Sequence, residues 1–115
     1  MAEIPSPPEH LGEAGRALWG ELHGQYELTE THHLRLLARA CEQEDRISGY
    51  RTVLAREGVV VVDPKGRTRP HPCLAEERAA GNLQRLLLRE LGLDHAGSPT
   101  EAARLPRGGR YNGGK

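Results

Sequence analysis

The chain has 115 residues, 16 of them basic and 16 acidic, so its formal net charge is zero. Hydrophobic residues make up 37% and aromatic residues 3%, which excludes a large aromatic core and suggests that part of the apolar surface serves other subunits. Cys41 and Cys73 are too few and too far apart for a disulfide framework, and no apolar run is long enough for a membrane span. We therefore expect a protein of a reducing cytoplasm.

The charges are unevenly distributed along the chain. Residues 1–30 contain six acids and one base, about −5, whereas residues 96–115 contain one acid and four bases, about +3. The segment from Asp63 to Arg69 adds three bases against one acid. A chain organised in this way presents a basic surface without being basic overall, although ordinary solvated charge is the alternative.

The N-terminal part is predicted to be an extended lead-in followed by a helix. Residues 1–10 contain three prolines and no apolar period, whereas residues 11–26 place apolar side chains three and four residues apart. This stripe comprises Leu11, Ala14, Leu18, Leu22 and Tyr26, with Trp19 beside it as an anchor.

A long helix is predicted next, with Thr29 as its N-cap, Glu30 in its first turn and Gly58 after its end. Its apolar positions form two stripes, which are Leu34, Leu37, Ala38 and Cys41, and then Ile47, Tyr50, Val53 and Leu54. We expect the first stripe to pack on Leu18 and Leu22, and the second on the last helix or on a neighbouring subunit. The carboxylates that interrupt the stripes, Glu42, Glu44 and Asp45, are interpreted as a solvated or inter-subunit surface.

Four consecutive valines, Val59–Val62, predict a strand, because β-branched residues favour extended backbone. A turn over residues 63–66 and a return strand over residues 67–69 complete a short β-hairpin. An isolated hairpin is marginally stable in water, so we expect it to pack on the helices or to pair with a neighbouring subunit.

The last predicted helix has Pro72 at its first position and Gly92 at its end, with Leu93 folding back on the last turn. Residues 94–115 are rich in glycine and basic residues and predict a flexible tail. The fold class is therefore mainly α, in the order helix, long helix, short β-hairpin, helix and disordered basic tail. The domains are a lead-in (1–10), a helical core (11–93) and the tail (94–115).

This order, with its residues, resembles the phage terminase small subunit family in a compact form that lacks a separate N-terminal helix-turn-helix domain. The matching pieces run over residues 8–11, 17–19, 28–29, 40–42, 58–60, 63, 66, 71–72, 74, 83, 87 and 91–93. Each piece alone is a capping or packing signal, and their ordered co-occurrence over about residues 7–94 carries the resemblance.

The resemblance implies a ring-forming homo-oligomer of roughly 8–12 subunits. It further implies binding of double-stranded viral DNA near the packaging start site, and recruitment or regulation of the large terminase subunit, which carries the ATPase and nuclease. It implies no catalytic residues, no cofactor and no membrane contact, and a location in the host cytoplasm.

Candidate DNA-binding residues are basic side chains in three segments, because phosphate contact is electrostatic. They are Lys65, Arg67 and Arg69 at the hairpin, Arg104, Arg107, Arg110 and Lys115 in the tail, and Arg35 and Arg39 on the long helix. The alternative for the hairpin is solvated turn charges. The alternatives for the tail are a soluble disordered tail or docking on the large subunit. For the helix the alternative is pairing with Glu42 or with a neighbouring subunit.

No metal-binding or catalytic motif stands out. His32 and His33 are adjacent, so we expect them to point to different sides of a helix, and His71 and Cys73 lack a second ligand pair at zinc spacing. There is no phosphate-binding P-loop and no nucleophile elbow. The alternative functions are a small helical DNA-binding regulator or an adaptor protein without catalytic activity.

Overall fold

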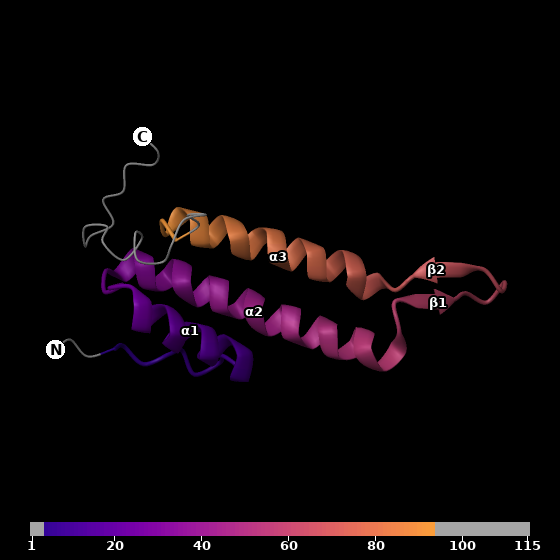
Figure 1. Cartoon of the computed structure of the whole chain (residues 1–115), viewed down its shortest axis with the longest axis horizontal. Coiled ribbons are helices and arrows are strands. Elements are labelled where there is room, and N and C mark those ends of the chain that lie inside the picture. The colour runs from indigo at the N-terminus through magenta and orange to yellow at the C-terminus, as the bar shows by residue number, and fades with distance from the viewer. Residues whose placement is uncertain (1–3, 94–115) are drawn as a thin grey trace.

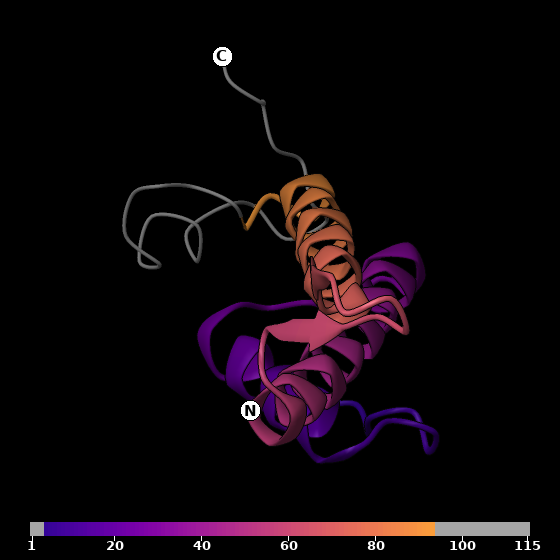
Figure 2. The same cartoon turned by 90° about the vertical axis from the view of Figure 1, so that its right-hand side faces the viewer.

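The computed structural model describes residues 4–93, which form three helices and one two-stranded antiparallel sheet. The elements are α1 (Glu13–Gln25), α2 (Thr31–Glu57), β1 (Val60–Val62), β2 (Thr68–Pro70) and α3 (Pro72–Glu90). Both α1 and α3 pack against α2, and the hairpin extends beyond the helices (Figure 1). Figure 2, seen from the hairpin end, shows α1 and α3 on different sides of α2. The predicted helical fold with a short hairpin is confirmed.

The start of α2 differs from the prediction. Its N-cap is Glu30, not Thr29, and no side chain caps the helix. The first helical hydrogen bond runs from the Leu34 N–H to the Glu30 carbonyl, at 2.9 Å. Leu28 is buried in the core, which holds the connecting segment outside the helix. The predicted end is correct, because Gly58 follows α2 with a φ of +87°, a conformation that favours glycine.

Both predicted ends of α3 are confirmed. Pro72 occupies the first helical position, where its missing N–H costs nothing. At the other end, the N–H of Gly92 bonds to the Arg89 carbonyl and the N–H of Leu93 to the Leu88 carbonyl, both at 2.9 Å. With Gly92 at a φ of +81°, this is a Schellman motif.

The core lies where α1, the N-terminal half of α2 and the C-terminal end of α3 meet. Its buried members are Leu11, Trp19, Leu28, Leu37, Cys41 and Leu91, with Leu18, Leu22 and Leu34 packed against them. This confirms the packing predicted between α1 and the first stripe of α2. The Trp19 indole N–H donates to the Pro5 carbonyl at 2.8 Å, so the lead-in is tied to α1.

The second stripe of α2 faces α3. Ile47 and Leu87 are buried, and Tyr50 lines a shallow groove between the two helices together with Leu83. Packing of this stripe on the last helix therefore agrees with the prediction.

The interpretation of Glu42, Glu44 and Asp45 as a solvated or inter-subunit surface is wrong. The two oxygens of Asp45 accept the N–H groups of Gly12 and Gly15, each at 2.7 Å, and so cap the N-terminus of α1. Gly12 has no side chain to serve this purpose, and the first amides of a helix need acceptors.

The other two carboxylates also bond within the subunit. Glu42 lies 2.7 Å from His10 of the lead-in, and Glu44 accepts a hydrogen bond of 2.7 Å from the Gln84 amide of α3. Gln84 also donates to the Ala40 carbonyl. The apolar pattern of α2 breaks here because polar contacts to other elements replace apolar ones.

Close approach of α1 to α2 depends on Gly15. A Cβ at this position would lie 2.6 Å from Asp45 Oδ2 and 2.8 Å from the Cys41 carbonyl oxygen. The second atom belongs to the backbone of α2 and cannot rotate away, so only glycine fits without moving one helix.

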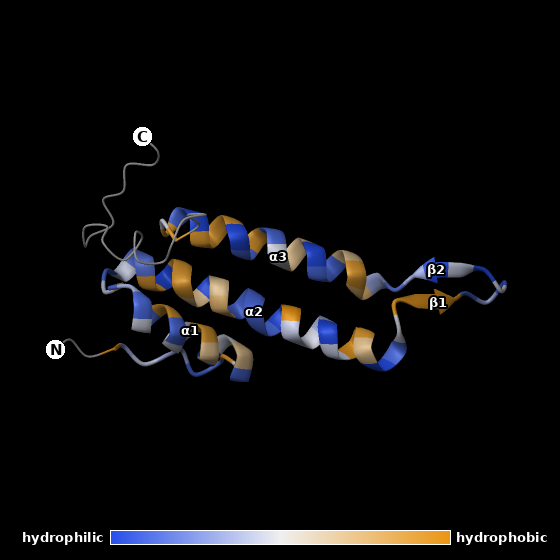
Figure 3. Cartoon of the chain, in the orientation of Figure 1, coloured by the Kyte–Doolittle hydropathy of each residue, from blue (hydrophilic) through white to orange (hydrophobic). Residues whose placement is uncertain are grey.

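The hairpin forms as predicted, with Val60 opposite Pro70 and Val62 opposite Thr68. The helices do not cover its apolar face, because Val60 and Val62 remain 53% and 67% exposed. Packing on the helices was one of the two predicted ways to stabilise the hairpin. The structure shows contacts with the helices only where the hairpin joins them, at Val59 and His71. Figure 3 shows β1 as an apolar segment at the end of the molecule away from the helical core.

We predict that Gly15→Ala destabilises the protein by about 1–3 kcal/mol, because the added methyl group overpacks the α1–α2 contact. Urea unfolding followed by circular dichroism measures the change. Gly49→Ala is the matched control, since nothing lies within 4 Å of a Cβ there. We expect this control to gain up to about 1 kcal/mol from helix propensity. Equal stability of the two variants would contradict the close-contact argument.

Candidate nucleic-acid interface

Asp63 builds the tip of the hairpin. Its Oδ1 accepts the N–H groups of Lys65 and Arg67, at 2.9 and 2.8 Å, and its carbonyl accepts the N–H of Gly66 at 2.9 Å. Gly66 has a φ of +82°, which this turn requires and which other residues rarely adopt. The turn residues themselves therefore shape the tip without help from the helices.

The same carboxylate orients two of the three predicted DNA-binding bases. Arg67 Nε and Arg69 Nε lie 3.0 and 3.1 Å from Asp63 Oδ2, while both side chains stay more than half exposed. Lys65 is exposed and has no ion-pair partner within residues 4–93. With three bases to one acid, the tip keeps a net positive charge.

Hydrogen bonds keep Asp63 ionised in mild acid. The backbone N–H of Arg67 is the main cause that lowers the pKa of Asp63, and the side chains of Arg69 and Arg67 add to it. Ion pairs made by such exposed guanidinium groups contribute little to stability, so they constrain Arg67 and Arg69 only weakly.

His71 joins the hairpin to both long helices. It is buried, and its Nδ1 accepts the N–H of Cys73 at 3.0 Å, which caps α3. Its Nε2 therefore carries the proton and donates to Glu57 at the end of α2, at 2.7 Å. The His71 backbone N–H donates to the Val59 carbonyl at 2.8 Å. These three contacts anchor the hairpin base.

A second basic surface lies on α2. Arg35, Arg39 and Arg46 are exposed and spaced four and seven residues apart, which places them on one helix face. Pairing with Glu42, one of the alternatives for these arginines, is wrong, because Glu42 contacts His10. Pairing with a neighbouring subunit stays a prediction. Within the described part of the chain, the two candidate residues Arg35 and Arg39 contact no carboxylate.

Comparison with known families decides the identity. The profile of a family described as phage terminase, small subunit, matches residues 16–107. The chain belongs to the phage terminase small subunit family. No curated protein and no solved structure matches the chain. The family places the protein in phage DNA packaging within the infected host cell.

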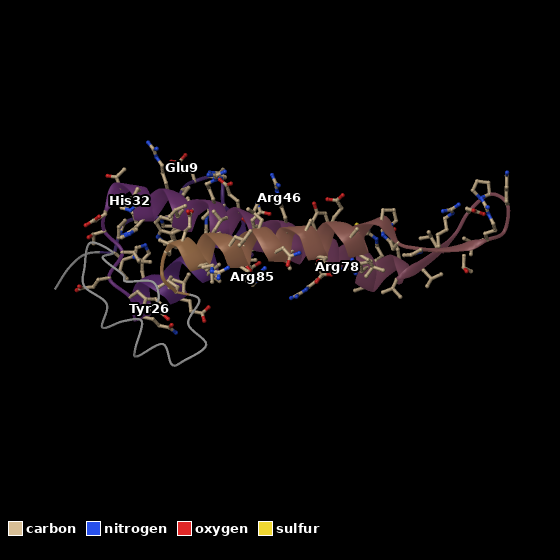
Figure 4. The ribbon with its side chains drawn as sticks, turned by 90° about the horizontal axis from the view of Figure 1, so that it is seen from above. Glu9, Tyr26, His32, Arg46, Arg78 and Arg85 are labelled. Atoms are coloured by element: carbon tan, nitrogen blue, oxygen red, sulfur yellow. The ribbon has the colours of Figure 1, made fainter. Side chains whose placement is uncertain are left out.

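The structure of this small subunit also exposes two basic residues that the sequence analysis did not select as DNA-binding candidates. Arg78 and Arg85 are exposed on α3, seven residues apart. Figure 4 shows both projecting on the side of the molecule opposite to Arg46. The sequence signal that could have identified them was their spacing of seven residues in a predicted helix, which places both on one face. The tail candidates Arg104, Arg107, Arg110 and Lys115 lie outside the described residues.

The group nearest to a metal site within residues 4–93 is Glu30, His32 and His33, whose ligand atoms lie within 4.8 Å of one another. The expectation that the two histidines point to different sides is wrong, since their ring centroids are 4.2 Å apart. The group lies at the N-terminus of α2, where the helix dipole disfavours a cation.

The remaining chemical candidates are also weak. Burial, followed by the charge of Asp45, raises the pKa of Cys41 to about 12, so this thiol is not a nucleophile at neutral pH.

Of the helices in the described range, none is both long and apolar enough to cross a membrane.

We predict that Glu57→Gln flattens the dependence of stability on pH in acid. The hydrogen bond from His71, and then the one from Arg56, lowers the pKa of Glu57 below its ordinary value of 4.5. The unfolded chain therefore binds more protons, and the stabilisation is present above pH 4.5 and lost as the pH falls through the folded-state pKa. Thermal unfolding from about pH 5 to about pH 3 measures this loss.

The control for this experiment is Glu90→Gln, which removes an exposed carboxylate without an ion-pair partner in the described range. It should retain the wild-type profile. The proposed role of Glu57 would be refuted if both variants followed the wild-type profile.

Proposed function

We propose that this small subunit binds double-stranded viral DNA near the packaging start site and recruits or regulates the large terminase subunit. The observation that carries the DNA contact is the basic hairpin, which projects beyond the helical body (Figure 1). A two-stranded antiparallel ribbon fits the major groove of B-form DNA. Lys65, Arg67 and Arg69 would then contact phosphates on either side of the groove.

Repetition of the hairpin in an oligomer supports this proposal. In a ring of roughly 8–12 copies, each weak set of phosphate contacts is repeated and the contributions combine. Arg35 and Arg39 form a second proposed strip on α2, and the tail bases Arg104, Arg107, Arg110 and Lys115 a third. Selection of the packaging site would depend on DNA shape and bending more than on base contacts.

The division of labour with the large subunit follows from the family. Terminase small subunits are in general non-catalytic regulators. We propose that the ATPase and nuclease activities stay with the large subunit, and that this chain uses no cofactor. The protein would act in the host cytoplasm, where both the viral DNA and the large subunit are present.

We predict that the triple variant Lys65→Ala, Arg67→Ala and Arg69→Ala binds duplex DNA at least about tenfold more weakly at low salt. Each lost phosphate contact should also reduce the slope of log K against log salt by about 0.9. Fluorescence anisotropy with a labelled duplex over a salt series measures both quantities.

Two further variants make the DNA test specific. Arg35→Ala with Arg39→Ala removes the α2 strip and should weaken binding less than the hairpin variant. Arg51→Ala removes one positive charge whose guanidinium already contacts Glu77 at 2.6 Å, and should bind as the wild type does. Wild-type affinity in the hairpin variant would overturn the proposed contact.

A further inference from the structure

The hairpin has two faces of different chemistry. Side chains of a strand alternate between the two faces of a sheet, and the register places Val60 opposite Pro70 and Val62 opposite Thr68. These four residues therefore share one face, which we call the apolar face. It carries no charged residue, and Val60 and Val62 are 53% and 67% exposed.

The two arginines of the hairpin belong to its other face. Val61 lies opposite Arg69 in the register. The Asp63 N–H donates to the Arg67 carbonyl at 2.8 Å, which continues the same alternation by one pair. Asp63 Oδ2 contacts the Nε atoms of Arg67 and Arg69 on this face, at 3.0 and 3.1 Å. The charged side chains of the two strands thus avoid the apolar face.

The apolar surface continues to the base of the hairpin. Val59 is 53% exposed, and it lies beside the start of α3. A shallow groove at this place is lined by Val59, Val60, Thr68, Arg69, Pro70 and Leu74. Arg69 borders this groove, so a partner that covers the apolar surface also meets a basic side chain.

Strand propensity alone does not explain the two valines of the apolar face. Threonine has a similar preference for strands and would be better solvated at an exposed position. Exposed apolar strands at the edge of a sheet invite pairing with other chains, and proteins tend to avoid them. Val60 and Val62 therefore indicate a partner that offers apolar groups to this face.

The charge of the hairpin distinguishes between two candidate partners. Two copies of the hairpin would repel one another, because each carries three bases and one acid between Asp63 and Arg69. The phosphates of DNA attract the same bases. Duplex DNA also offers an apolar group, because the C5-methyl group of thymine is exposed in the major groove. DNA thus matches both the basic tip and the apolar face.

We propose that the apolar face of the hairpin contacts thymine methyl groups in the major groove, so that the protein prefers sites containing thymine. A ribbon in this groove turns one face to the bases. The other face carries the carboxylate of Asp63, which the acceptor atoms of adenine, guanine and thymine would repel. This inference rests on the proposed function and adds a base preference to selection by DNA shape.

Removal of the methyl group from the DNA tests this contact. The probes are two duplexes of roughly 20 base pairs, about two helical turns. One alternates adenine and thymine, and the other has deoxyuridine in place of every thymine. We expect the wild type to bind the thymine duplex more tightly, by about fourfold for each methyl group buried. Fluorescence anisotropy at low salt measures both dissociation constants.

Two variants connect the preference to the apolar face. Val60→Ser with Val62→Ser should lower the ratio of the two affinities to about one, because the apolar contact is lost. Its salt dependence should remain that of the wild type, since the bases at the tip are retained, and this shows that the hairpin is still formed. Val61→Ser is the matched control, because Val61 belongs to the same strand but to the other face. It should keep the wild-type ratio.

The outcomes separate this contact from DNA binding in general. Equal affinity of the wild type for the two duplexes would overturn the thymine contact and leave DNA binding intact. A thymine preference that persists in the double-serine variant would also overturn it, because other residues or DNA shape would then be the cause. If the wild type has no preference and the double-serine variant loses mass in light scattering, the apolar face is a contact between copies. A wild type that binds neither duplex would refute the proposed function and this contact with it.

Discussion

The carboxylate of Asp45 organises the subunit, because it connects α1 to α2 at the point where the two helices touch. It accepts the N–H groups of Gly12 and Gly15 at 2.7 Å and so provides the cap that α1 lacks in its own sequence. Gly15 makes this possible, since any larger residue would meet Asp45 and the Cys41 carbonyl. The position of α1, and with it the acidic surface of the first thirty residues, depends on this contact.

A second polar contact has the same importance at the other end of the molecule. His71 caps α3 through Nδ1 and donates to Glu57 of α2 through Nε2, so one buried side chain sets the direction of the hairpin. Asp63 then holds Arg67 and Arg69 at the tip. The net charge of zero thus combines an acidic N-terminal segment, which includes α1, with a basic hairpin tip and the exposed arginines of α2. The basic hairpin tip supports the proposed contact with DNA.

This member of the phage terminase small subunit family has few buried core residues and several exposed apolar side chains in the described range. The core is small and contains one tryptophan and several leucines, whereas valines of β1 and leucines of α3 remain exposed. A chain of this size gains stability when such residues are covered by other copies.

The sequence by itself determined the helices, the hairpin, the ends at Gly58 and Gly92, and the basic tip at residues 65–69, because these features depend on neighbours a few positions away. Only the tertiary structure decided which partners Glu42, Glu44 and Asp45 have, and why Arg35 and Arg39 meet no carboxylate within residues 4–93. It also placed Arg78 and Arg85 on the side of the molecule opposite to Arg46 (Figure 4). The physical reason is distance along the chain: Asp45 meets Gly15 across 30 residues and Gln84 meets Glu44 across 40, and no local pattern records such pairs.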